Sequence, residues 1–167
     1  MKKLILVTLS IVLFYAATSK AQTKTATGTF AVKISEIIDL TVSSGNALTF
    51  DFNDMSKLDN GIEQLNAVTL TSKSNQPWFV SVKANAANFT GGDVTTPMPA
   101  SVIKFKNADG GTYLPLSTTD AALSGTAGSK NPRGTSTIKV DYRLDPGYAY
   151  GPASDYAMTI TYTISKL

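Results

Sequence analysis

Ser154 to Leu167, with the sequence SDYAMTITYTISKL, is the stretch that decides the fold. Apolar side chains occupy every second position in it, and alanine or threonine stands between them. An alternation with a period of two is typical of a β-strand with one face in the core and the other in water. The row expected to face inward is Tyr156, Met158, Ile160, Tyr162 and Ile164.

The same alternation recurs along the chain between short turns rich in glycine, proline, asparagine and aspartate. No stretch beyond residue 21 keeps a helical period for three turns. Short strands without intervening helices predict an all-β fold, an antiparallel immunoglobulin-like (Greek-key) β-sandwich of about nine strands. The expected strands are residues 28–35, 37–42, 47–52, 65–73, 78–84, 101–106, 112–116, 136–144 and 155–165.

Three further rows are expected to face the core, because alternate side chains of a strand share a face. Two long connections, 85–100 and 117–134, are expected as exposed loops because they are rich in glycine, proline and small polar residues. The three inward rows are Phe30, Val32 and Ile34; Trp78, Val80 and Val82; and Ile138, Val140, Tyr142 and Leu144.

The first residues, MKKLILVTLSIVLFYAATSKAQ, have the order of a secretory signal peptide: two lysines, an apolar run, and small residues around a cleavage point after Ala21. The apolar run is shorter than the roughly 20 residues that a membrane span requires. The sequence therefore predicts a signal peptide at 1–21 and one β-sandwich domain at 22–167.

The charge balance argues against nucleic-acid binding. The chain has 15 basic and 12 acidic residues, but three of the lysines belong to the expected signal peptide, so the remainder is neutral. A neutral domain has no basic surface for nucleic acid or for anionic lipid, and no membrane insertion is expected after cleavage. The absence of cysteine excludes disulfides and a lipid-bearing cysteine, which fits an exported bacterial protein, secreted or at the cell surface, with the periplasm left open.

The residue inventory predicts a protein that is not an enzyme. The chain contains no histidine and no cysteine, so it lacks the usual general base, the thiol nucleophile and the common transition-metal ligands. Most carboxylates stand beside glycine, proline or asparagine, where they make turns. No catalytic residue and no cofactor is expected.

One acidic stretch, DFNDMSKLDNGIE at 51–63, is a weak candidate for calcium. Its oxygen ligands are crowded, but the spacing differs from that of an EF-hand, so no metal is predicted and a polar turn is the preferred interpretation. The candidate ligands are Asp51, Asn53, Asp54 and Asp59.

Tyrosines supply the candidate ligand-binding residues, since an aromatic ring can stack on a sugar. Tyr113, Tyr148 and Tyr150 are the candidates, and the last two lie in the turn-rich motif DPGYAYGP. The alternative for Tyr148 or Tyr150 is a tyrosine corner, in which the hydroxyl fastens a loop to the sandwich.

Two stretches resemble the WxL domain, a secreted β-sandwich of bacterial cell surfaces with a Trp-x-Leu motif in mid-domain and a Tyr-x-x-Thr-Leu-x-Trp-x-Leu motif near its end. PWFVSV supplies the first and YAMTITYTI the second, with substitutions that keep size and apolarity. Similar endings occur in pilus-type immunoglobulin-like subunits of bacteria. The resemblance implies a surface domain, and for WxL proteins it implies peptidoglycan attachment. The motif residues are Trp78, Val80, Tyr156, Thr159, Ile160, Tyr162 and Ile164.

Two functions remain open from the sequence. The first is an exported, non-enzymatic structural or adhesion protein, fimbria-like in that identical subunits assemble by strand complementation. Its donor would be the alternating N-terminal segment TKTATGTFAVKI at 23–34. The alternative is a carbohydrate- or peptidoglycan-binding module whose partner is a cell-surface polymer.

Overall fold

The structure is a computed structural model that describes residues 24–92, 95–124, 131 and 133–166. The expected signal peptide lies outside the described residues. The chain divides into two units, Met1–Ile34 and Ser35–Leu167, which are treated separately below.

Residues 24–34, the described part of the first unit, contain neither strand nor helix. The side chains expected to face the core, Phe30, Val32 and Ile34, are 94%, 82% and 80% exposed. The prediction of a core strand at 28–35 is therefore wrong. Alternation makes a segment able to act as a strand, but a strand is stable only when another strand supplies hydrogen-bond partners and a buried face.

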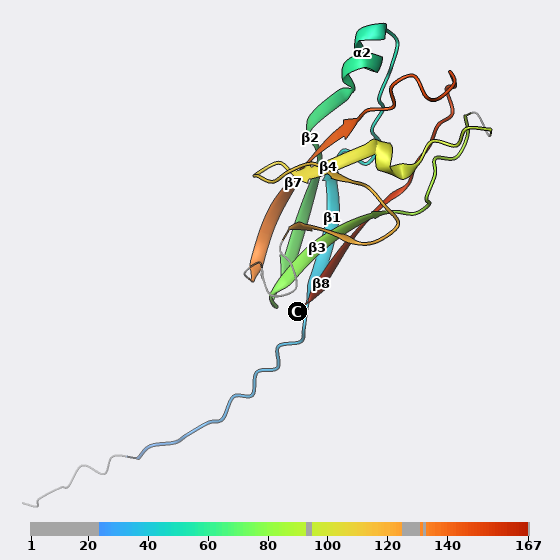
Figure 1. The fold of residues 1–167 in the computed structure, drawn as a ribbon. Coiled ribbons are helices and arrows are strands. Elements are labelled where there is room, and N and C mark those ends of the chain that lie inside the picture. Colours follow the sequence, from blue (N-terminus) through green and yellow to red (C-terminus); the bar gives the residue numbers. More distant parts are fainter. Residues whose placement is uncertain (1–23, 93–94, 125–130, 132, 167) are drawn as a thin grey trace, which may run out of the picture. The chain divides into compact units, whose positions relative to one another are not determined.

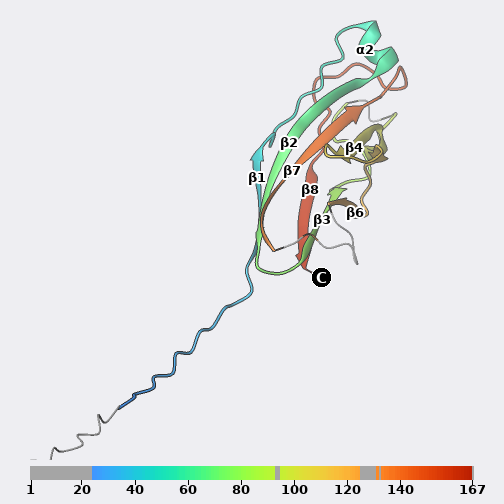
Figure 2. The same ribbon diagram turned by 90° about the vertical axis from the view of Figure 1, so that its left-hand side faces the viewer.

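The second unit is a two-layered antiparallel β-sandwich, which confirms the expected fold class (Figure 1). One sheet has the strand order β1-β2-β7-β4-β5, and the other has the order β6-β3-β8. Seen from the side, β1, β2 and β7 lie in one layer and β3, β6 and β8 in the other (Figure 2). The strands are β1 (Ile38–Ser44), β2 (Ile62–Ser74), β3 (Trp78–Ala84), β4 (Ile103–Asn107), β5 (Leu114–Pro115), β6 (Ala121–Ser124), β7 (Gly134–Leu144) and β8 (Ile160–Lys166).

Two short helices were not expected, α2 (Met55–Asn60) and the 3-10 turn η2 (Ala100–Val102). The first begins at Asp54, whose carboxylate accepts a hydrogen bond of 2.9 Å from the Lys57 amide. A side-chain oxygen at this position satisfies a backbone donor that has no partner within the helix. A helix of six residues is too short to leave a periodic signal in the sequence.

Two predictions, the strand at 47–52 and the exposed loop at 117–134, are wrong in part. Residues 47–52 form no strand, although their apolar side chains pack against the core. The loop contains β6, which pairs with β3 and buries Leu123. Because β6 has only four residues, alternation could not reveal it.

The core forms between the two sheets, from rows that the alternation predicted correctly. Trp78, Val80 and Val82 on β3 are completely buried. The facing row of β7 is also buried, from Ile138 to Leu144. A core with this density supports a domain that has no disulfides.

The two stretches that resemble WxL motifs lie on neighbouring strands. β3 pairs with β8 so that Val80 stands opposite Ile164 and Val82 opposite Tyr162. The motif residues Val80 and Tyr156 are 76 positions apart along the chain, and strand pairing makes the apolar residues of β3 and β8 one continuous surface.

A β-bulge interrupts the β2–β7 ladder between Gln64 and Val68. Its residue Asn66 has a φ of 51° and donates its amide to Asp141 Oδ1 at 2.7 Å. The other carboxylate oxygen of Asp141 lies 3.4 Å from Lys106 Nζ. A buried carboxylate is stable only with such partners, so Asp141 holds the bulge in place.

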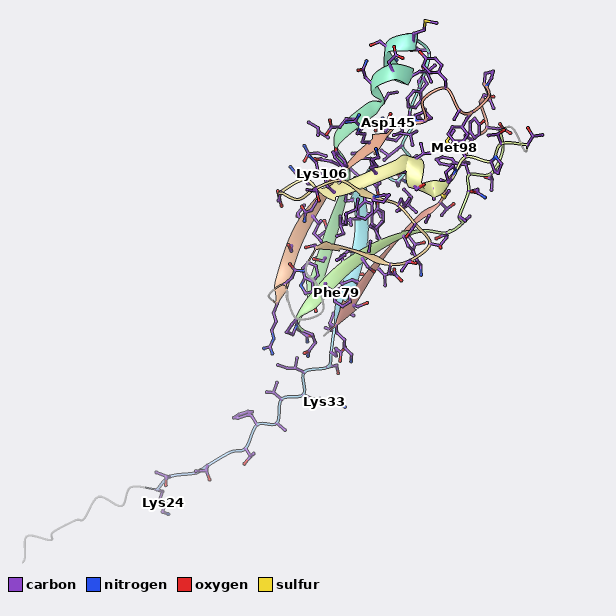
Figure 3. The ribbon with its side chains drawn as sticks, viewed as in Figure 1. Lys24, Lys33, Phe79, Met98, Lys106 and Asp145 are labelled. Carbon is purple, nitrogen blue, oxygen red and sulfur yellow. The ribbon has the colours of Figure 1, made fainter. Side chains whose placement is uncertain are left out.

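The sandwich has two distinct ends. α2 lies at one end, and Lys106 and Asp145 lie toward it (Figure 3). Phe79, near the start of β3, lies toward the other end, where β8 finishes (Figures 1 and 3). The first strand, β1, begins at this second end, because Glu36 forms an ion pair with Lys166 at the end of β8.

Candidate functional site

The two sheets of the sandwich are unequal, since a five-stranded sheet faces a three-stranded one. β1 is an edge strand of the larger sheet and β8 an edge strand of the smaller, and the two strands contact each other. Ile38 and Leu40 on β1, and the alternate apolar side chains of β8, pack against the core without being fully covered. Val42, on the same face of β1 by alternation, is 40% exposed. We call these two edges the β1/β8 seam; its side chains are Ile38, Leu40 and Val42 on β1 and Ile160, Tyr162 and Ile164 on β8.

On β8, the residues whose side chains line the seam are also those whose backbone groups point away from β3. Asn85 donates to the Thr159 carbonyl at 3.0 Å, so odd-numbered residues of this segment point their backbone toward β3. Hydrogen-bonding direction alternates along a strand, so the amides and carbonyls of Ile160, Tyr162 and Ile164 point to the opposite edge. In the described part of the chain β8 pairs with β3 alone.

The backbone hydrogen-bonding direction alternates in the same way along β1. The Asn75 amide donates to the Ile37 carbonyl at 3.1 Å, so odd-numbered residues face β2. The backbone groups of Ile38 and Leu40 therefore point away from the sheet, and β2 is the one described partner of β1. Within the described residues, the seam thus combines backbone groups that have no strand partner with apolar side chains that are only partly buried, which is the chemistry that an added strand needs.

A hydrogen bond crosses the sandwich beside the seam. The hydroxyls of Tyr142 on β7 and Tyr162 on β8 lie 2.5 Å apart. Burial raises the pKa of Tyr162 from 10.0 to about 12, and burial together with the neighbouring Tyr162 raises the pKa of Tyr142. Both hydroxyls are therefore held in their neutral form, in which one can donate to the other.

We expect this tyrosine pair to make the sandwich sensitive to alkali. A raised pKa in the folded state means that the unfolded chain loses its proton first, so stability is constant below pH 10 and falls as the pH rises toward 12. Equilibrium unfolding in urea between pH 8 and 12 measures the loss. Tyr142→Phe should remove part of this pH dependence, and an unchanged profile in that variant would show that other groups cause it.

Tyr113, a candidate ligand-binding residue, lies against the outer face of the larger sheet. Its hydroxyl donates to Glu63 Oε1 at 2.6 Å, and Lys106 Nζ lies 4.7 Å from its ring centre. Burial and the bond to Glu63 raise the pKa of Tyr113. These contacts fasten the chain before β5 to β2 and β4, and they occupy the hydroxyl and one face of the ring.

The other two tyrosine candidates lie in the connection from β7 to β8. Tyr148 is 63% exposed and donates to Asp59 Oδ1 at 2.9 Å, whereas Tyr150 is partly buried. The contact that matches a tyrosine corner is made by Tyr156, which donates to the Gly151 carbonyl at 3.0 Å, five residues upstream. The ring of Tyr156 also packs edge-on against Phe89.

The acidic residues considered for calcium have individual structural partners. Asp51 accepts a bond from Asn53 at 3.0 Å, Asp54 caps α2, and Asp59 accepts from Tyr148. Across the described residues no three carboxylates, histidines or cysteines stand close enough to hold one metal ion.

The sequence does not predict the seam as a site, although it predicts that Ile160, Tyr162 and Ile164 face the core. Alternation identifies the inward face of a strand, but it is the same for an edge strand and a central one. The sequence signal for such a site is the alternation of the N-terminal segment 23–34, which predicts a strand that can be donated to a neighbouring copy.

Comparison with known proteins leaves the family open. No protein-family model matches the chain, and no curated protein matches it. Among solved structures, a chain from a chaperone-usher pilus is similar with a TM-score of 0.42 and 8% identity, over 89% of this chain and 97% of that chain. The resemblance to WxL domains therefore stays a prediction, and function is argued from this chain's own residues. Within the described ranges no helix is long and apolar enough to cross a membrane.

Proposed function

We propose that this protein is a non-enzymatic structural subunit of an exported bacterial surface assembly, in which residues 26–34 of one copy add a strand to the β1/β8 seam of the next copy. The observation that supports the proposal is the seam itself: two edge strands whose outer edges have no strand partner among the described residues and whose inward side chains are only partly buried. A strand added beside β8 would extend the three-stranded sheet to four strands, facing the sheet of five.

The N-terminal segment has the chemistry of the missing strand. Phe30, Val32 and Ile34 stand on alternate positions and are exposed. Three apolar side chains over five residues match the three inward side chains between Ile160 and Ile164. Burial of each large apolar side chain stabilises by about 1.5–3 kcal/mol, so the row can supply roughly 5–9 kcal/mol to the contact between copies.

The choice of a second copy as partner follows from the chain itself. A segment that exposes three large apolar residues is a hazard in a monomer, because unpaired alternating strands aggregate. A seam and a matching segment in one chain allow each copy to donate to one neighbour and to accept from another, which produces an open filament. Location at the cell surface and a role in adhesion stay predictions from the sequence.

The intact protein is expected to form ladders that resist sodium dodecyl sulfate, and deletion of residues 22–34 is expected to leave only monomers. The reason is that the deletion removes the donor and keeps the seam. A synthetic peptide of residues 24–35, added to the truncated protein, should then raise its Tm by about 5 °C or more.

The control peptide has the same composition with the alternation broken, and it should leave the Tm unchanged. Identical ladders with and without residues 22–34, or equal effects of the two peptides, would contradict the proposal. Retention of the truncated protein on peptidoglycan or another cell-wall polymer would instead favour the binding-module alternative.

A further inference from the structure

The side chain of Asn75 holds the residues that join the N-terminal segment to β1. Its Nδ2 donates to the Ser35 carbonyl at 2.8 Å, and its Oδ1 accepts from the Ile37 amide at 2.9 Å. The Asn75 backbone amide also donates to the Ile37 carbonyl at 3.1 Å. Together the three bonds extend the β1–β2 ladder past its last paired residue, and they keep Ser35 and Ile37 extended.

These are the residues that would have to bend if a copy filled its own seam. In that case the segment would fold back along β1, which is the other edge of the seam from the β8 edge used in exchange between copies. The result is an antiparallel hairpin, in which directly opposed residues share a face. With a loop of two residues, Val32 would stand opposite Asp39, and the apolar row would face away from the core. With a loop formed by 35–37, Val32 stands opposite Leu40 and the row faces the core.

The shortest three-residue loop that keeps the correct register and leaves Phe30, Val32 and Ile34 all in the strand is therefore 35–37. All three hydrogen bonds to Asn75 would then be lost, because they require an extended backbone. The ion pair between Glu36 and Lys166, at 3.0 Å, would also be disturbed, although an exposed pair contributes little. A three-residue hairpin loop favours glycine at its left-handed position, and Ser35-Glu36-Ile37 has none.

We propose that Asn75 is a positioning residue that selects the partner of the seam: by holding Ser35 and Ile37 extended, it disfavours closure of a copy on itself and leaves the N-terminal segment for a second copy. This inference rests on the proposed function and adds to it the choice between self and neighbour. A copy that closes on itself has used both its donor and its acceptor and ends a filament.

The position of Asn75 does not depend on its own side chain. Ser74 Oγ accepts from the Gln76 amide at 3.0 Å and donates to the Gln76 carbonyl at 2.8 Å, which fixes the turn between β2 and β3. Asn75→Ala should therefore fold. Gln76→Ala is the matched control, because Gln76 makes these contacts through its backbone.

The test uses Val32→Cys together with Leu40→Cys, a pair that within one copy is opposed only in the closed form. The chain has no other cysteine, so a disulfide within one copy reports self-closure as a faster-migrating monomer after mild oxidation. Asn75→Ala in this background is expected to raise the ratio of closed monomer to oligomer by about tenfold or more, since it removes two hydrogen bonds. Adding Ile37→Gly should raise it further, and Gln76→Ala should not change it.

An unchanged ratio in both Asn75→Ala and the double variant with Ile37→Gly would overturn the role of Asn75. If ladders of the protein without added cysteines still depend on residues 22–34, the proposed function survives that result. Ladders that do not depend on those residues would remove the proposed function, and the role of Asn75 with it.

Discussion

Val32→Lys is expected to abolish assembly and leave the folded monomer unchanged. Val32 is the middle residue of the exposed row, and in the proposed complex its side chain enters the apolar seam between Leu40 and Tyr162. Burial of an unpaired ammonium group costs several kcal/mol, which corresponds to a loss of affinity of a thousandfold or more. Analytical ultracentrifugation at matched concentration measures the change in assembly, and circular dichroism checks the fold.

Ala31→Lys is the matched control for this variant. Ala31 is the preceding residue, so in a strand its side chain points to the opposite face, toward water. Ala31→Lys introduces the same charge one position away on the water-facing side, so assembly should persist. Equal loss in both variants would indicate that net charge, and not insertion of the row, governs association.

Trp78→Ala is expected to destabilise the sandwich by about 3–5 kcal/mol, because the side chain is completely buried and its removal leaves a large cavity. Single domains are stable by only about 5–15 kcal/mol, so this variant should unfold at much lower urea concentration or fail to fold at 37 °C. Equilibrium unfolding followed by circular dichroism measures the effect.

Phe79→Ala provides the comparison on the same strand. Phe79 is half-buried on the face of β3 that points away from the core, so its loss should cost much less than that of Trp78. A cost for Phe79→Ala as large as that for Trp78→Ala would mean that the outer face of β3 is covered in solution and that the assignment of faces is incomplete.

Some of the core could be predicted from the sequence because alternation is a local property. The rows Trp78 to Val82 and Ile138 to Leu144 are inward and buried as expected, and β3 matches its predicted bounds. The short elements were missed for the same reason, since β6 and α2 are too short to show a period.

The candidate site could be predicted only in part. The capacity of residues 23–34 to act as a donor strand was visible in their alternation, and exchange between copies was considered for that reason. The segment's expected place in its own core was wrong, because Phe30, Val32 and Ile34 are exposed. The tyrosines singled out for binding are in part engaged with carboxylates, Tyr113 with Glu63 and Tyr148 with Asp59.

The sequence by itself determined which side chains share a face, because a strand alternates whether or not it has a partner. Only the tertiary structure decided which strands are neighbours and which edges stay open, since pairing depends on contacts between residues far apart in the chain. For that reason the strand β8 could be recognised from its residues. The seam beside it, and the hydrogen bonds from the Asn75 side chain to Ser35 and Ile37, could not be predicted from the sequence.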